Sequence, residues 1–231
     1  MNILKLLIAA VILCAATTPK KDNSDVLPSA EEQVFDFGHV GIDYTIYHSF
    51  PFENRTDDTI RIISATSNCG CGHITVLDSI VAPDDTTNFR LRYSTKNLYG
   101  KIKRSFTIIT DHSILDTLTY KYLSNVGQWF SGLRPEPAAL IFLPKKTTQT
   151  VHIPNRKFDV ISLSKVIQYD SSFSIKVNED RAKKGSALVL EIKPLPDIKT
   201  GTYVTNATLY IKTDEDSPPT ILTLPIKIIR Y

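Results

Sequence analysis

Short runs of alternating apolar and polar residues recur from residue 34 to the end of this chain, separated by turn residues. The clearest run covers residues 44–52. One face would carry Tyr44, Ile46, His48, Phe50 and Phe52, and the other face would carry Thr45, Tyr47, Ser49 and Pro51. A period of two is typical of a strand with one buried face, because successive side chains point to opposite faces. No segment carries an apolar stripe with helical spacing over three turns. The pattern therefore predicts an all-β fold.

The length and the spacing of turn signals predict two domains. At 231 residues, the chain can form two domains of common size, each with its own core. Residues 34–124 contain seven expected short strands, a number typical of an immunoglobulin-like β-sandwich. Residues 125–137 contain glycines and prolines and predict a linker, in which we expect Trp129 and Phe130 to pack between the domains. Residues 138–231 repeat the strand pattern, so the predicted fold is two tandem immunoglobulin-like β-sandwich domains after an N-terminal signal segment.

A weak internal echo supports two related modules. Gly100 precedes an expected strand that ends in Thr110-Asp111 and is followed by a turn and a second apolar run. Gly201 precedes a strand that ends in Thr213-Asp214 and is followed in the same way. Two modules are too few for a repeat array of the solenoid type.

The first sixteen residues differ in character from the rest. Lys5 interrupts an apolar stretch that is too short to span a bilayer as a helix, so residues 1–16 are predicted to be a signal peptide. Residues 17–33 are polar and are expected to form a flexible leader. The prediction is an exported protein of the periplasm or cell envelope, with no transmembrane span in the mature chain.

Cys14 leaves the processing of this segment open. Cleavage before Thr17 would remove Cys14, whereas lipidation of Cys14 would give a lipid-anchored protein, for example an outer-membrane lipoprotein. Leu13 precedes Cys14, where a lipoprotein signal normally has a small residue. A retained signal anchor is the third alternative.

Composition and motifs argue against several classes of function. The net charge is +3, and no cluster of lysine and arginine is interleaved with aromatic residues, so no nucleic-acid partner is expected. The chain has no Gly-x-Ser-x-Gly, His-Glu-x-x-His, phosphate-binding glycine loop or EF-hand pattern. We therefore predict no catalytic residues and no enzymatic activity.

Residues 34–124 resemble a known bacterial family in the order of their motifs. The motifs are Phe35-Asp36-Phe37-Gly38-His39-Val40, His48-Ser49-Phe50-Pro51-Phe52-Glu53-Asn54, Cys69-Gly70-Cys71, Ala82-Pro83 and a Gly100-led strand. This order is similar to that of the domain of unknown function 1573 family. Asp84 stands where that family usually has a turn glycine. The resemblance implies an exported immunoglobulin-like module, related to those of major sperm protein, pilus chaperones and ciliary ASH domains, and it implies no activity.

Cys69 and Cys71 are the residues with the most distinctive chemistry. On a continuous strand, Cys69, Cys71 and His73 would share one face, because side chains at i, i+2 and i+4 point the same way. Thiolates with an imidazole suit copper(I) or zinc, with copper(I) the better match. A structural zinc site needs a fourth ligand, which would have to come from elsewhere in the fold.

The same two cysteines also predict a disulfide. Bridging residues two apart on a strand requires a bend, which Gly70 could permit. Such a bond could be a reversible redox site. In the structural alternative, Gly70 and Gly72 allow a bulge or sharp bend, and the two cysteines, oxidised or not, fill small spaces near a sheet edge. These alternatives stay open at the level of sequence.

The sequence favours a non-enzymatic binding or scaffold protein of the cell envelope, built from two β-sandwiches. Its partner would be another envelope protein, bound by loops or by an edge strand. The alternative is an accessory protein for soft-metal binding (copper or zinc) or thiol redox chemistry that uses Cys69 and Cys71.

Overall fold

The computed structural model describes residues 27–29 and 33–231. The predicted signal peptide at 1–16, Cys14 and most of the predicted leader at 17–33 lie outside these residues. Within the described part of the chain, no helix combines the length and the apolar character needed to cross a membrane.

Strands dominate the described residues, so the predicted all-β fold is confirmed. The first half contains β1 (Val34–Val40), β2 (Thr45–Glu53), β3 (Ile60–Ser67), β4 (Gly72–Val76), β5 (Ile80–Val81), β6 (Thr86–Ser94), β7 (Gly100–Thr110) and β8 (Thr117–Val126). A short 3-10 turn, η1 (Phe130–Gly132), follows. The second half contains β9 (Leu140–Phe142), β10 (Gln149–Pro154), β11 (Val160–Gln168), β12 (Phe173–Glu179), β13 (Arg181–Lys183), β14 (Ala187–Pro194), β15 (Gly201–Lys212) and β16 (Thr220–Arg230).

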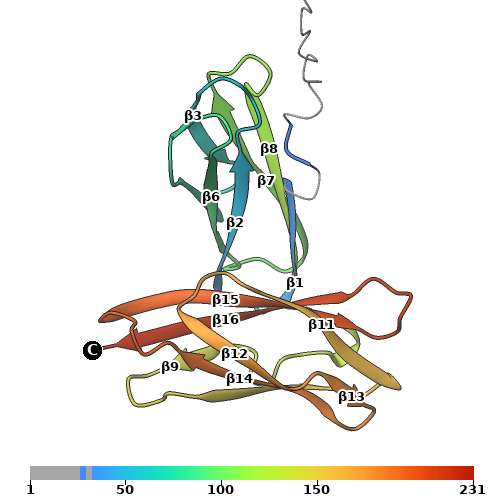
Figure 1. Cartoon of the computed structure of the whole chain (residues 1–231). Helices are drawn as coiled ribbons and strands as arrows, with labels where there is room; N and C mark the ends of the chain where they lie inside the picture. Colours follow the sequence, from blue (N-terminus) through green and yellow to red (C-terminus); the bar gives the residue numbers. More distant parts are fainter. Residues whose placement is uncertain (1–26, 30–32) are drawn as a thin grey trace, which may run out of the picture.

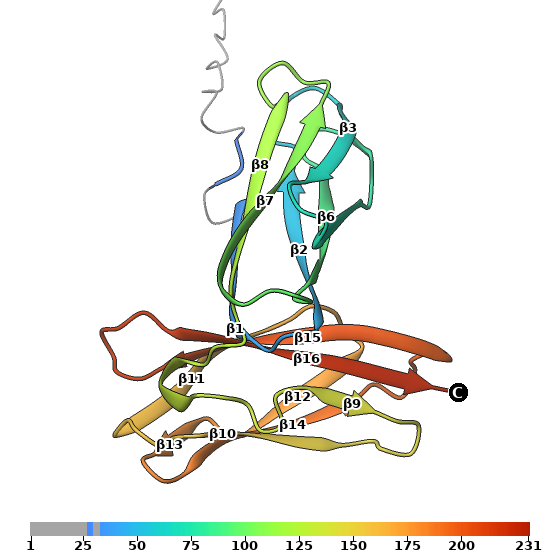
Figure 2. The same ribbon diagram turned by 180° about the vertical axis from the view of Figure 1, so that it is seen from behind.

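The two halves pair their strands in the same order. In the first half the order is β5-β3-β7-β8-β1 in one sheet and β2-β6-β4 in the other. In the second half it is β13-β11-β15-β16-β9 and β10-β14-β12. β1 pairs with both β8 and β16 and so joins the two larger layers into one 10-stranded sheet. Figure 1 and Figure 2 show the strands of the first half standing nearly upright over β15 and β16.

Each half has its own hydrophobic core, because the alternating residues of its two sheets face each other. One cluster of buried side chains is drawn from β1 to β8 and the loop after β7. A second cluster is drawn from Leu133 and from β9 to β16.

A buried asparagine occupies the same place in each half. Asn54 follows β2 and donates its side-chain N–H groups to the Asp58 and Val81 carbonyls, at 2.8 and 2.9 Å. Asn155 follows β10 and donates in the same way to the Phe158 and Ala182 carbonyls, at 2.8 and 2.9 Å. Neither side chain is exposed. Each amide therefore joins a loop carbonyl, Asp58 or Phe158, to the carbonyl of a short edge strand, Val81 of β5 or Ala182 of β13.

The turn before β6 and the turn before β14 also correspond. The Asp84 amide donates to the Asn54 carbonyl, and the Gly185 amide donates to the Asn155 carbonyl. Both residues have a positive φ, 61° for Asp84 and 88° for Gly185. Asparagine and aspartate tolerate this conformation better than most side chains, which explains how Asp84 can stand at a glycine position.

The halves meet at β1, where the backbone of Gly38 comes very close to β16. Gly38 has φ of 61°, and a Cβ atom on it would lie 2.0 Å from the Ile221 carbonyl oxygen. The Thr223 hydroxyl donates to the Phe37 carbonyl at 2.6 Å. Only glycine fits at position 38 without moving one of the two strands.

Side chains from both halves complete this junction. The Tyr47 amide donates to Asn206 Oδ1 at 2.6 Å, and the rings of Tyr47 and Tyr169 stack with centroids 5.1 Å apart. Phe130 lies 6.3 Å from the His39 ring and 6.1 Å from the Phe158 ring. Phe130 therefore contacts both halves, which is the packing expected for it.

Candidate functional site at the turn between β3 and β4

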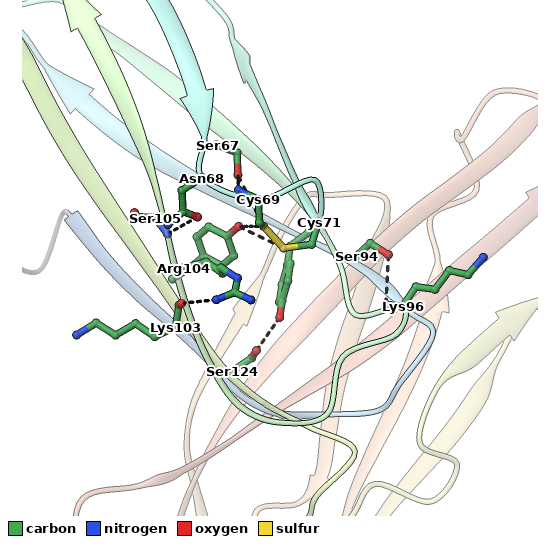
Figure 3. The surroundings of a disulfide bond; sticks show 12 residues. Ser67, Asn68, Cys69, Cys71, Ser94, Lys96, Lys103, Arg104, Ser105 and Ser124 are labelled. Carbon is green, nitrogen blue, oxygen red and sulfur yellow. Dashed lines mark hydrogen bonds between the residues drawn. A yellow bond between two sulfur atoms is a disulfide. The ribbon is translucent and has the colours of Figure 1, made fainter.

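The turn between β3 and β4 carries the cysteine pair. β3 ends at Ser67 and β4 begins at Gly72, and a disulfide joins Cys69 to Cys71 across the turn. Both cysteines are partly exposed, and Gly70 between them is exposed. Figure 3 shows this disulfide with its neighbours from β6 and β7. The turn is therefore open to solvent in part, while Cys71 also packs against the core of the first half.

Hydrogen bonds hold both ends of the turn. Asn68 bonds Ser105 of β7 three times, through its amide to the Ser105 carbonyl at 3.1 Å and through its side chain to the Ser105 hydroxyl and amide at 3.0 and 3.2 Å. On the other side, the Ser94 amide donates to the Cys71 carbonyl at 2.8 Å. The turn is thus attached to both sheets of the first half.

Gly72 is the glycine that this turn requires. A Cβ atom at position 72 would lie 2.5 Å from the Tyr122 hydroxyl and 2.7 Å from Ser67 Oγ. Gly70 has open space around it and is not among the residues with positive φ. The role of Gly70 in the bend therefore stays a prediction, whereas the missing side chain of Gly72 makes room for the phenol beneath the disulfide.

Tyr122 of β8 lies beneath the two sulfur atoms. Its hydroxyl is 3.4 Å from Cys69 Sγ and 4.0 Å from Cys71 Sγ. Burial raises the pKa of Tyr122, and a hydrogen bond with Ser67 and the charge of Arg104 partly offset the rise. The phenol is therefore protonated at neutral pH and has a proton to donate toward sulfur.

Arg104 brings a positive charge to the same place. It lies opposite Tyr122 in the β7–β8 ladder, and its charge acts on the pKa of both Tyr122 and Tyr93. Its side chain is partly buried, and Nε has no hydrogen-bond partner. Its guanidinium is therefore a cation with unused donor capacity close to the phenols.

The predicted site residues are brought together only in part. Cys69 and Cys71 are joined, whereas His73 is exposed on β4 and lies opposite Arg92 of β6. Among residues 27–29 and 33–231, no three His, Cys, Asp or Glu side chains are grouped closely enough to hold a metal ion. Copper or zinc binding by Cys69, Cys71 and His73 stays a prediction.

No pattern in the sequence pointed to Tyr122 or Arg104 as neighbours of the cysteines. Tyr122 belongs to the alternating run of β8, where Leu118, Tyr120 and Tyr122 are buried, and such a pattern indicates core packing. Its hydroxyl meets the sulfur atoms only because β3, β7 and β8 are adjacent in one sheet. That adjacency links positions 53 residues apart and has no local signal.

A family model matches most of the first half of the chain. The family model described as "Protein of unknown function (DUF1573)" matches residues 28–121. The predicted resemblance is confirmed over this segment. No curated protein matches the chain.

Similar solved structures are distant. A protein of unknown function from Porphyromonas gingivalis W83 is 10% identical with a TM-score of 0.33, over 83% of this chain and 95% of that one. The CupB2 chaperone of Pseudomonas aeruginosa is 10% identical with a TM-score of 0.30, over 80% and 95%. The periplasmic chaperone SfaE is 9% identical with a TM-score of 0.31, over 86% and 98%. Such low values carry no conclusion about function.

Proposed function

We propose that this chain is an exported, non-enzymatic binding protein of the cell envelope, built from two immunoglobulin-like β-sandwiches. It binds an extended segment of another envelope protein by strand addition, in which the ligand adds a strand to a free sheet edge. The observation that carries this proposal is the open edge of β4 in the first half.

The hydrogen-bond register shows which backbone groups of β4 are free. Cys71 and Leu77 both bond to β6, through the Ser94 amide to the Cys71 carbonyl and through the Leu77 amide to the Asn88 carbonyl. Alternate residues of an antiparallel strand bond to the same neighbour, so the backbone groups of Ile74 and Val76 point away from β6. They form a short template for another strand.

The other edge of the same sheet is blocked. On β2, the outward amide of Tyr47 is bonded to Asn206, and Pro51 has no amide hydrogen. Proline on an edge strand is a known protection against pairing. β4 is thus the accessible edge of this sheet.

The equivalent strand of the second half is also protected. β12 pairs with β14 through a shift in register between Val177 and Glu179, and it carries the charged Lys176 and Glu179. Bulges and charges on an edge strand discourage pairing. β4 pairs with β6 without a register shift, and His73 is its one ionisable residue. The first half therefore supplies the docking edge.

Site-specific photocrosslinking in the native host tests this proposal. A photoreactive amino acid is placed at Thr75, which is exposed on β4, and at Lys176 on β12 as the matched control. We expect a discrete crosslinked envelope protein from position 75 and none from position 176. Equal products from both positions, or no product from position 75, would contradict strand addition at β4. Fractionation of the same cells tests export, since the protein should be found in the envelope fraction.

A further inference from the structure

The turn that carries the cysteines has a counterpart without cysteines in the second half. The Ser94 amide donates to the Cys71 carbonyl, and the Leu195 amide donates to the Ser172 carbonyl in the same way. Cys71 therefore corresponds to Ser172, and Cys69 corresponds to Asp170. In the second half, Asp170 Oδ1 accepts hydrogen bonds from the Ser172 hydroxyl at 2.5 Å and from its amide at 2.9 Å. This fold thus closes the same turn without sulfur.

The side chains beneath the two turns also differ between the halves. The strands β7 and β15 begin at corresponding glycines, Gly100 and Gly201. At the same distance from that glycine, Arg104 pairs with Tyr122 in the first half and Thr205 pairs with Ile226 in the second half. The phenol and the guanidinium occur only in the half that has the two cysteines. Neither is needed for the fold, because the second half forms the same ladder with a threonine and an isoleucine.

We propose that Cys69 and Cys71 form a thiol–disulfide exchange site, with Tyr122 as hydrogen-bond donor to the departing Cys69 sulfur and Arg104 as the cation that stabilises the thiolate. The reactant is a dithiol in another protein. This activity is independent of strand addition at β4.

The exchange takes place in two steps. A thiolate of the partner attacks Cys71 Sγ and forms a mixed disulfide, and the electron pair of the broken S–S bond goes to Cys69 Sγ. The second thiol of the partner then loses its proton and attacks the partner sulfur of the mixed disulfide, which releases Cys71 as a thiolate. The two thiolates then take up two protons from water, which balance the two that the partner thiols released. In total, two electrons and two protons pass from the partner to the cysteine pair, and the partner leaves as a disulfide.

The positions of the atoms decide which sulfur leaves. The Tyr122 hydroxyl is closer to Cys69 Sγ than to Cys71 Sγ, at 3.4 against 4.0 Å. Negative charge develops on the departing sulfur, so a donor on that side lowers the barrier, and the charge of Arg104 acts on the phenol that supplies this donor. A lower pKa of the departing thiol also speeds exchange.

Positive charge around the turn favours an anionic reactant. Arg90 and Arg92 of β6 and Lys103 of β7 are exposed on the two strands that flank the turn. The acidic turn residues of the first half lie in other connections: Asp43 in β1–β2, Asp57 and Asp58 in β2–β3, Asp78 in β4–β5, Asp84 and Asp85 in β5–β6, and Asp111 and Asp116 in β7–β8. An approaching thiolate is therefore attracted to the turn.

The rate of reduction by dithiothreitol under native conditions tests the proposal. Alkylation and mass spectrometry at timed intervals measure the reduced fraction of the full mature chain. We expect the native disulfide to be reduced at least tenfold faster than the same disulfide in urea-unfolded protein, and Tyr122→Phe to slow the native reaction about tenfold. A single hydrogen bond to a charged atom accounts for this factor.

Tyr93→Phe is the matched control, because the Tyr93 hydroxyl bonds the Ser124 hydroxyl and takes no part in the proposed exchange. It removes the same atom from a neighbouring buried tyrosine and should change the rate less than twofold. Equal rates for wild type and Tyr122→Phe, or a native rate no faster than the unfolded one, would overturn the proposal.

The pH dependence of ionisation of the Cys69 thiol distinguishes an electrostatic role of Arg104 from a purely structural one. Ultraviolet absorbance of the reduced protein follows ionisation of the Cys69 thiol. Arg104→Met should raise the pKa of that thiol, because a nearby cation favours the thiolate, and Arg104→Lys should restore most of the difference. An unchanged titration in Arg104→Met would remove Arg104 from the site.

Discussion

The two halves of this chain form their strands in the same order but fill their cores with different side chains. The first core is rich in aromatic residues: Phe35, Phe37, Phe50, Phe52, Phe89, Tyr93, Phe106, Tyr120 and Tyr122. The second core is mainly aliphatic: Val151, Ile153, Leu188, Leu190, Ile192, Leu209, Ile211, Leu222, Leu224, Ile226 and Ile228. The strand order therefore depends on which positions are buried, and the identity of the apolar residue there is secondary.

Two features lie at the same place in both halves: a buried asparagine side chain and a residue with a left-handed backbone conformation. Asn54 and Asn155 make the same pair of bonds, and Asp84 and Gly185 both have a positive φ. These positions are constrained because a buried amide or a left-handed residue has few substitutes, whereas a core position has many. Besides the core residues, the halves differ in the chemistry of the two equivalent turns and of the groups beneath them.

The largest effect is expected at Gly38, where the two halves touch. Gly38→Ala places a Cβ atom 2.0 Å from the Ile221 carbonyl oxygen at a positive φ, so β1 or β16 must shift. We expect a loss of about 4 kcal/mol in the free energy of unfolding, measured by urea titration. Gly100→Ala is the control, because Gly100 has φ of 80° in open space and should lose only about 1 kcal/mol. Equal losses would show that contact across the junction is unimportant.

The paired asparagines should respond alike. Asn54→Ala and Asn155→Ala each leave two buried carbonyl groups without donors, and we expect each to lower the free energy of unfolding by about 3 kcal/mol. Two probes are needed: fluorescence of Trp129, which packs on the second core, and circular dichroism for the whole chain. If one variant is severely destabilised and the other is neutral, the two halves share their strand order but not the energetic role of the buried asparagine.

The pH dependence of stability should come from the first half, through His48. Burial lowers the pKa of His48 to about 3, and its ring stacks on Phe35 with centroids 3.5 Å apart. The unfolded chain binds a proton near pH 6.5 and the folded chain does not, so stability is complete above that pH and falls as pH decreases toward 3. The slope should approach 1.4 kcal/mol per pH unit, by the relation ~1.36 kcal/mol for each unit of pKa.

His48→Gln gives the first half the residue that the second half has at the equivalent place, Gln149. Urea titrations at several pH values between 4 and 7 should show a smaller slope for this variant than for wild type. A slope that the substitution leaves unchanged would assign the pH dependence to other groups.

Local patterns in the sequence predict most of the strands, because alternation is a property of neighbouring residues. The Gly100 and Gly201 echo corresponds to β7–β8 and β15–β16, which pair along nearly their full length. The strands β4, β5 and β13 escape prediction because they are short or follow the cysteine turn directly. Cys69 and Cys71 are evident as a pair from their spacing alone.

The surroundings of the cysteines cannot be predicted in this way. Tyr122 and Arg104 approach the turn through ladders between distant segments, and the sequence of β8 gives Tyr122 only the signature of a core residue. The role of Gly72 is hidden for the same reason, since the atom it makes room for belongs to another strand. Register across a sheet is set by the whole fold.

The smallest effect on stability, and the sharpest test of the comparison, comes from moving the cysteine pair. Asp170→Cys with Ser172→Cys should form a second disulfide, because these residues occupy the positions of Cys69 and Cys71 in an equivalent turn. Closing so short a loop should change the free energy of unfolding by about 1.5 kcal/mol at most.

With Cys69→Ser and Cys71→Ser in the same chain, only the new bond remains, above Ile226 and Thr205 in place of Tyr122 and Arg104. We expect dithiothreitol to reduce it about tenfold more slowly than the natural bond, as followed by alkylation and mass spectrometry. Equal rates would mean that the turn alone sets the reactivity and that the phenol and the guanidinium contribute nothing to it.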